Sequence, residues 1–245
     1  MKIILKIIVL VLFIINKSYA TDIEIPVFFH DNPFSDESID TELRGVRILS
    51  VDDENFPNYL RESHKKVISE IKIKGFLNVS ISKNNNIKST IKNKKLERSI
   101  NTRSKQDFTQ RKEVLISKLQ LDMVDLMKTP LKGATLISIK ASGAMQEAGW
   151  TGVSRLLEDG YFGGVILEED EFGLYDGGII LISELINVTI NGEPGILIEE
   201  RSFNNEPYTT LQWASSNKSF ILKVTQSASK GNKLKRLIEL AESLY

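Results

Sequence analysis

The C-terminal third of the chain, residues 163–245, constrains the fold most strongly because short apolar runs there alternate with turn residues. Two such runs, 165–167 and 178–182, are bounded by glycines, as buried strands often are. Asn191-Gly192 separates two more, and this dipeptide accepts the positive φ angles that a tight hairpin turn requires. The pattern therefore predicts an antiparallel sheet.

The last two strands and a closing helix are predicted to share one layer of the core. Apolar side chains recur at every second position and then at helical spacing in three successive runs: Leu211 and Trp213; Phe220, Leu222 and Val224; Leu234, Leu237, Ile238, Ala241 and Leu244. Such a helical stripe can cover one face of a sheet. We expect an α+β protein with a curved antiparallel sheet and packed helices in its C-terminal half.

The first twenty residues have the pattern of an export signal. A charged start precedes an unbroken apolar run at 7–15, and the small residues Ser18 and Ala20 stand at the cleavage positions. The sequence predicts a signal peptide over residues 1–20, a mature chain beginning at Thr21, and a periplasmic or secreted protein. A retained signal anchor is the alternative. No later stretch has the ~20 apolar residues of a membrane span, so no transmembrane segment is expected after cleavage.

The composition excludes several functional classes. The chain contains no cysteine, which rules out disulfides, thiol chemistry and lipidation on a cysteine. It has 32 basic and 32 acidic residues, and removal of the three lysines in the signal leaves 29 against 32. A protein that binds nucleic acid through its overall charge would be strongly basic, so we expect no nucleic-acid partner.

The remaining chain divides into three predicted regions. Residues 21–82 are predicted to form a small α/β unit whose helix ends at Gly75. Residues 83–106 form a basic segment with few apolar side chains, and such a segment is typical of a flexible linker. It is either a solvated linker or a patch for an anionic surface such as acidic lipid headgroups. Residues 107–245 are predicted to form the sheet domain.

The start of the sheet domain carries a second helical pattern. Asp107 and Gln110 have the spacing of a capping box, and an apolar stripe follows until Pro130. A strand is predicted at 134–140. A glycine-broken stretch follows, and a short helical piece is then predicted at 153–157.

Candidate catalytic residues are few, because the chain has only two histidines. His30 lies in a polar loop beside Asp31, whereas His64 shares the apolar face of a predicted helix and is expected in the core. Neither lies near a nucleophile-elbow motif. The sequence therefore assigns no catalytic residue, no cofactor-binding residue and no cofactor.

The densest acidic cluster is Glu168-Glu169-Asp170-Glu171 with Asp176. Converging carboxylates could bind a hard cation such as calcium. The alternative is that they are solvated charges of a β-turn, because the spacing matches no calcium loop. We therefore assign no metal ligand from the sequence, and the cation question stays open.

The C-terminal part also resembles a known family. The order strand, Asn-Gly turn, strand, Leu211-Gln-Trp213, a second strand and a helix ending in Leu240-Ala-Glu-Ser-Leu244 spans about residues 185–245. It resembles the extracytoplasmic domain of unknown function of anti-sigma-type and sporulation-associated bacterial proteins. That domain is similar to lipoprotein-carrier-like and sigma-regulatory periplasmic domains, with a curved sheet and packed helices. The resemblance implies core positions for Trp213, Leu240 and Leu244, and no catalytic residue.

Two functions remain as hypotheses. The first is a non-enzymatic binding or accessory protein of a bacterial envelope that presents a sheet face to a protein or lipid partner. The second is a secreted hydrolase that uses His30 and nearby carboxylates. A hydrolase requires those groups to converge in a concave pocket, whereas a binding protein requires an exposed apolar or charged surface. The oligomeric state is not indicated by the sequence.

Overall fold

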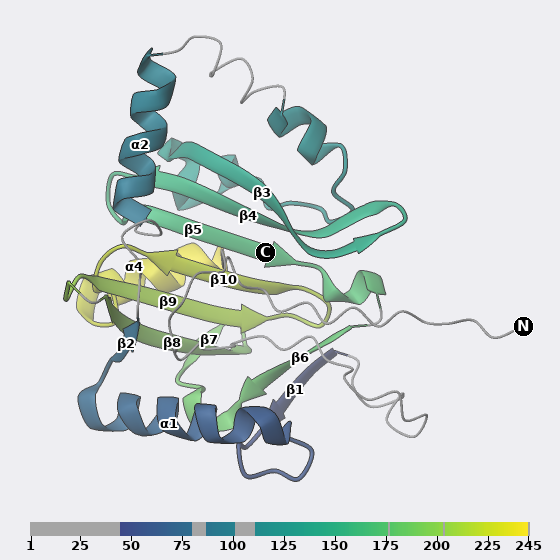
Figure 1. The fold of residues 1–245 in the computed structure, drawn as a ribbon, viewed down its shortest axis with the longest axis vertical. Helices are drawn as coiled ribbons and strands as arrows, with labels where there is room; N and C mark the ends of the chain where they lie inside the picture. The colour runs from purple at the N-terminus through teal and green to yellow at the C-terminus, as the bar shows by residue number, and fades with distance from the viewer. Residues whose placement is uncertain (1–44, 80–86, 101–110, 176, 203, 245) are drawn as a thin grey trace, which may run out of the picture.

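A computed structural model describes residues 45–79, 87–100, 111–175, 177–202 and 204–244 (Figure 1). The strands are β1 (Gly45–Leu49), β2 (Leu77–Val79), β3 (Thr135–Gln146), β4 (Gly149–Asp159), β5 (Gly163–Asp170), β6 (Gly178–Ile182), β7 (Val188–Ile190), β8 (Glu193–Ser202), β9 (Pro207–Ala214) and β10 (Ser219–Val224). The helices are α1 (Asn58–Lys74), α2 (Ile87–Ile100) and α4 (Gly231–Glu242), with 3₁₀ turns η2 (Leu126–Lys128), η3 (Pro130–Gly133), η4 (Phe172–Tyr175) and η5 (Ser183–Leu185).

In the described part of the chain, the strands form a large mixed sheet and a small parallel one. The large sheet has the order β2-β8-β9-β10-β5-β4-β3, with β7 paired to β8. All its pairs are antiparallel except β2 with β8. β1 and β6 pair in parallel beside it. Helices and a large mixed sheet confirm the α+β class.

The strands of the predicted N-terminal unit pair with distant parts of the chain. β1 pairs with β6, and β2 pairs with β8 across more than a hundred residues. α1 ends where predicted, because Gly75 adopts the left-handed conformation (φ 76°) that its missing Cβ allows. Residues 21–44 lie outside the described part, and the division into domains stays a prediction.

Residues 87–100 differ from the expected linker, since they form helix α2. Ile87 and Ile91 are one helical turn apart, and both are buried. They contact the sheet over Gly164, where a Cβ would lie 2.6 Å from Ile87 Cγ2. Lys95 also pairs with Glu158 at 2.7 Å. Ile87 and Ile91 of this basic segment are thus placed where a helix can bury them.

One face of the large sheet is covered by α4, as the sequence predicts. The shared cluster includes Trp213, Phe220 and Leu222 from the strands, and Leu237 and Leu240 from the helix. Figure 1 shows α4 behind the sheet, with α1 and the β1–β6 pair at one end of the opposite side and α2 at the other. None of the helices in the described ranges is both long and apolar enough to cross a membrane.

Two of the predicted helical elements are wrong, the helix that ends at Pro130 and the short piece at 153–157. Within the described residues, the predicted helix before Pro130 is helical only at 111–116, and the chain then continues without regular helix to η2. Residues 153–157 belong to strand β4 instead of a helix. They are buried between neighbouring strands and core, and sheet pairing overrides their local helical pattern.

Candidate binding site

Of the two histidines, only His64 lies within the described residues, and it belongs to the core. His64 is fully buried, its Nδ1 lies 2.8 Å from the Leu60 carbonyl oxygen, and its ring meets the Phe56 ring edge-on at 5.5 Å. This confirms its expected place in the core. His30 and Asp31 lie outside the described residues, so the hydrolase alternative stays a prediction.

The acidic cluster lies on a strand and not in a turn. Glu168, Glu169 and Asp170 are the last three residues of β5, and successive side chains of a strand point to opposite faces. Glu169 is 1% exposed and Asp170 is 4% exposed, so the expectation of solvated turn charges is wrong for these two residues. Within the described ranges, no three acidic or histidine side chains are grouped to hold a metal ion. Asp176 lies outside those ranges.

Glu169 belongs to a buried ion-pair network. Arg155 on β4 donates from Nη2 to Glu169 Oε1 and from Nη1 to the Val124 carbonyl oxygen at 2.9 Å. Lys218 Nζ lies 2.9 Å from Glu169 Oε2, and the Val124 amide donates to the same oxygen at 3.0 Å. The network attaches the irregular segment around Val124 to the sheet, because Val124 bonds to both Arg155 and Glu169. Burial of each charged side chain is costly unless its partner is buried with it.

Asp170 belongs to a second buried group. Thr151 Oγ1 donates to Asp170 Oδ1 at 2.8 Å, and the Tyr175 hydroxyl donates to Oδ2 at 2.9 Å. Burial raises the pKa of the Asp170 carboxyl, although these two hydrogen bonds act in the opposite direction. A Cβ at Gly143 would lie 2.4 Å from Asp170 Oδ1, so only glycine lets β3 approach this group.

Glu168 lies opposite Ser154 of β4 in the large sheet. Ser154 Oγ donates to Glu168 Oε1 at 3.2 Å, and burial raises the pKa of this carboxyl. Elsewhere in the same sheet, Glu200 on β8 accepts hydrogen bonds from Thr210 Oγ1 and Lys223 Nζ. Each of the three acidic groups of β5 accepts a hydrogen bond from a β4 side chain. Glu169 and Asp170 also bond to residues outside the strands, so the cluster links these segments to the sheet.

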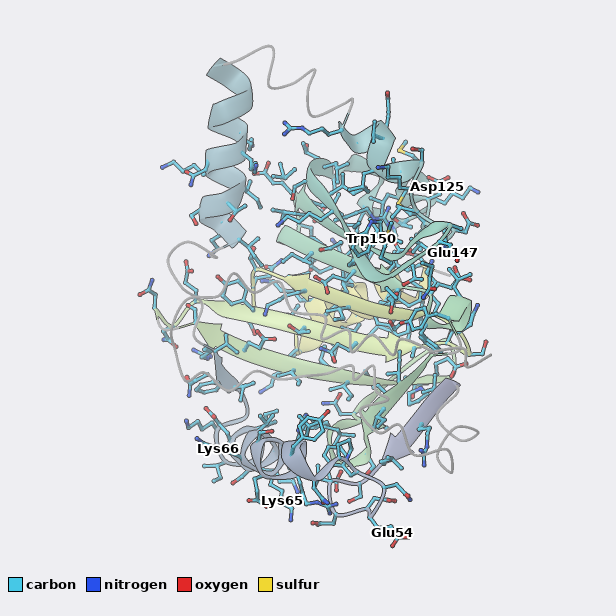
Figure 2. The ribbon with its side chains drawn as sticks, turned by 45° about the vertical axis from the view of Figure 1, so that its right-hand side comes forward. Glu54, Lys65, Lys66, Asp125, Glu147 and Trp150 are labelled. Atoms are coloured by element: carbon cyan, nitrogen blue, oxygen red, sulfur yellow. The ribbon has the colours of Figure 1, made fainter. Side chains whose placement is uncertain are left out.

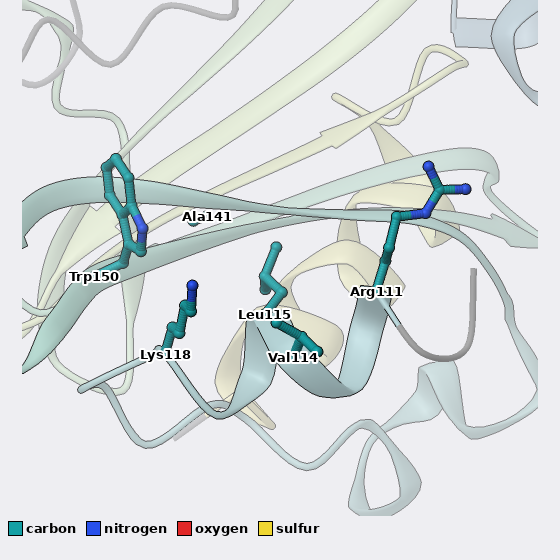
Figure 3. A pocket seen from close by; sticks show the side chains of 6 residues that line it. All are labelled: Arg111, Val114, Leu115, Lys118, Ala141 and Trp150. Atoms are coloured by element: carbon teal, nitrogen blue, oxygen red, sulfur yellow. The ribbon is translucent and has the colours of Figure 1, made fainter. Parts of the chain in front are cut away.

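An open cavity of about 450 Å³ lies elsewhere, between the segment 111–118 and the β3–β4 hairpin. Its lining residues are Arg111, Val114, Leu115, Lys118, Ala141 and Trp150 (Figure 3). Figure 2 shows Trp150 at the same end of the molecule as Glu147 and Asp125, whereas Glu54, Lys65 and Lys66 lie at the opposite end.

Backbone hydrogen bonds set the shape of this cavity. The Trp150 amide donates to the Lys118 carbonyl oxygen, and the Gln120 amide donates to the Trp150 carbonyl oxygen, both at 2.8 Å. Gly149 permits this contact: its φ is +137°, and a Cβ there would lie 2.1 Å from the Lys118 oxygen. The segment is thus held against β4 just where the β3–β4 register shifts, between Ser142 and Met145.

The cavity combines apolar walls with cationic side chains. Figure 3 shows Lys118 beside the Trp150 ring and Arg111 at the far end, with Leu115 and Val114 between them. Val114 is 56% exposed, although it is apolar. No acidic residue is among the six that line the cavity. An apolar pocket with a few charged groups is the usual form of a binding site for a small molecule.

Comparison with family models, with curated proteins and with solved structures finds no match to this chain. The cavity residues were not singled out from the sequence. Their local pattern predicts a longer helix through Leu119, and nothing in it indicates that this segment meets Trp150 thirty residues later.

Proposed function

We propose that this protein is an exported, non-enzymatic binding or accessory protein of a bacterial envelope, with its binding site in the cavity between segment 111–118 and Trp150. The observation that supports this most is the contrast between that cavity and the acidic groups of β5. The cavity offers apolar walls and cations to solvent, whereas the carboxylates bond to neighbouring strands. The partner is a protein or lipid of the envelope.

Export rests on the pattern of residues 1–20. N-terminal sequencing of the protein recovered from the periplasm or medium should begin at Thr21. A cytoplasmic product that begins at Met1 would contradict the export part of the proposal.

The binding role is tested by site-specific photo-crosslinking in intact cells. A photoreactive residue at Val114, on the cavity, should give a discrete adduct. The same residue at Ile73 on α1 should give none. Both positions are exposed β-branched side chains, at 56% and 79%, and they lie at opposite ends of the molecule. Equal adducts from both positions would contradict a specific site.

The hydrolase alternative makes a different prediction. Purified protein would cleave a substrate, and His30→Ala would abolish that cleavage while leaving the Val114 adduct unchanged. Such a result would add catalysis to the binding role, whereas cleavage without any Val114 adduct would replace the binding role with catalysis.

A further inference from the structure

We infer that the cavity binds a single-chain amphiphile with an anionic head, that is, a free fatty carboxylate. This inference rests on the proposed function and names the ligand class of the same site. It is carried by the distribution of charge and apolar surface among the six lining residues.

The first argument is charge complementarity. Arg111 and Lys118 are the two charged side chains of the cavity, and both are cationic. Lys118 forms no ion pair within the described residues, so none of their carboxylates competes there with an incoming anion. Arg111 adds a planar guanidinium group, which can donate two parallel hydrogen bonds to a carboxylate. An anionic head is therefore favoured over a neutral or cationic one.

The second argument is the apolar surface beside those charges. Trp150 and Leu115 form the walls, and Val114 extends them to the rim. The volume, about 450 Å³, lies in the lower part of the usual range of ~300–1,000 Å³ for small-molecule sites. The cavity is also open to solvent. These dimensions suit one flexible chain better than a two-chain lipid.

The third argument is the short distance between the two kinds of surface. Lys118 projects beside the Trp150 ring, so a carboxylate at Lys118 places the first part of its chain on the indole face (Figure 3). The backbone bonds between Lys118 and Trp150 hold these two residues together before any ligand arrives. A site formed in advance loses less conformational entropy on binding.

The two tryptophans allow a direct test. Trp213 is fully buried and its indole nitrogen has no hydrogen-bond partner in the described ranges, so Trp213→Phe should remove its fluorescence with little structural change. In residues 21–245 carrying this substitution, Trp150 is the one remaining tryptophan. Dodecanoate, added below its micelle concentration, should change Trp150 emission in a saturable way.

Matched probes isolate the head group. Dodecyltrimethylammonium and dodecanol carry the same chain, and acetate carries the head alone. We expect each to bind at least tenfold more weakly than dodecanoate. Equal binding of the three chain-bearing probes would overturn the role of the cations, and absence of saturable dodecanoate binding would overturn the inference itself.

Matched variants locate the site. Lys118→Glu should weaken dodecanoate binding at least tenfold by calorimetry with an unchanged melting temperature. Lys132→Glu makes the same charge change at an exposed residue of η3 and should have no effect. An unchanged affinity in Lys118→Glu would overturn the inference, as would binding to phosphatidylglycerol vesicles without binding of monomeric dodecanoate.

Failure of this inference is distinguishable from failure of the proposed function. If Val114 crosslinks to an envelope protein while dodecanoate does not bind, the ligand class is wrong and the binding role stands. If neither the crosslink nor the titration gives a signal, both are wrong.

Discussion

Trp213 and Phe220 lie directly opposite each other on β9 and β10, with their rings stacked 5.0 Å apart and within 9° of parallel. Trp213 is fully buried, and α4 covers the cluster to which both rings belong. Because the indole nitrogen has no hydrogen-bond partner among the described residues, Trp213 stabilises this part of the fold through burial and stacking.

The first prediction follows from this stacked pair. Trp213→Ala should lower the free energy of unfolding by ~3–5 kcal/mol, because apolar burial is lost and a cavity remains. Trp213→Phe is the matched control; it retains a stacking ring and should lose much less. Thermal melts measure both, and an unchanged midpoint in Trp213→Ala would contradict the core position. Deletion of residues 234–245 should lower the stability by a similar amount, since it removes most of α4 and uncovers the sheet face on which Trp213 lies.

The second prediction concerns the buried pair of Arg155 and Glu169. Arg155→Met should destabilise by ~3–5 kcal/mol, because a buried carboxylate then loses its closest partner. The double variant Arg155→Met with Glu169→Leu should recover much of the lost free energy of unfolding, since replacing Glu169 by leucine removes the unpaired buried carboxylate. Lys218 can then turn to solvent, its side chain being 15% exposed.

Denaturant titration of the two single variants and the double variant measures the coupling between Arg155 and Glu169. Strictly additive losses would show that the two side chains act independently, contrary to the structure.

The third prediction is a pH dependence that comes from Asp170. Burial raises the pKa of its carboxyl above the ordinary 3.8, so the folded state binds this proton more tightly than the unfolded state does. The resulting stabilisation is fully present below about pH 3.8 and is lost as the pH rises through the folded pKa. Between the two pKa values, the free energy of unfolding should fall by about 1.4 kcal/mol for each pH unit.

Asp170→Asn isolates this effect because asparagine cannot titrate. The stability of the wild type should fall relative to the variant as the pH rises from 4, and then level off. Glu147→Gln, at an exposed residue, is the matched control and should follow the wild type throughout. A difference between wild type and Asp170→Asn that does not vary with pH would contradict the prediction.

The fourth prediction concerns α2. Because Ile91 is buried against the sheet, trypsin should cleave slowly after Lys94 and Lys95 in the folded protein. Ile91→Asp should release the helix and speed that cleavage, as followed by mass spectrometry. Asn93→Asp adds the same charge at an exposed position and should leave the rate unchanged. Rapid cleavage in the wild type would restore the flexible-linker interpretation of these residues.

Much of the C-terminal fold could be predicted because its patterns are local. Asn191 and Gly192 adopt φ angles of 51° and 89°, as a hairpin turn between β7 and β8 requires. Trp213 lies under the apolar stripe of α4, where strand alternation and helical spacing place it. Gly75 ends α1 for the same local reason.

The predictions failed where long-range pairing decides the structure. Residues 153–157 became part of β4 because neighbours on both sides supply the hydrogen bonds of a strand. Glu169 is buried because Arg155 on the adjacent strand and Lys218 just before β10 meet it. The adjacent acidic residues alone gave no sign of these partners.

The sequence by itself determined the absence of thiol chemistry, the α+β class and the core position of Trp213, since each depends on composition or on spacing within one element. Export stays a prediction from the pattern of residues 1–20. Only the tertiary structure decided that 87–100 is a packed helix and that Lys118 meets Trp150. Both outcomes depend on glycines, at 164 and 149, whose missing side chains let distant backbone or side chains approach. Such contacts have no local periodicity, and therefore no sequence pattern predicts them.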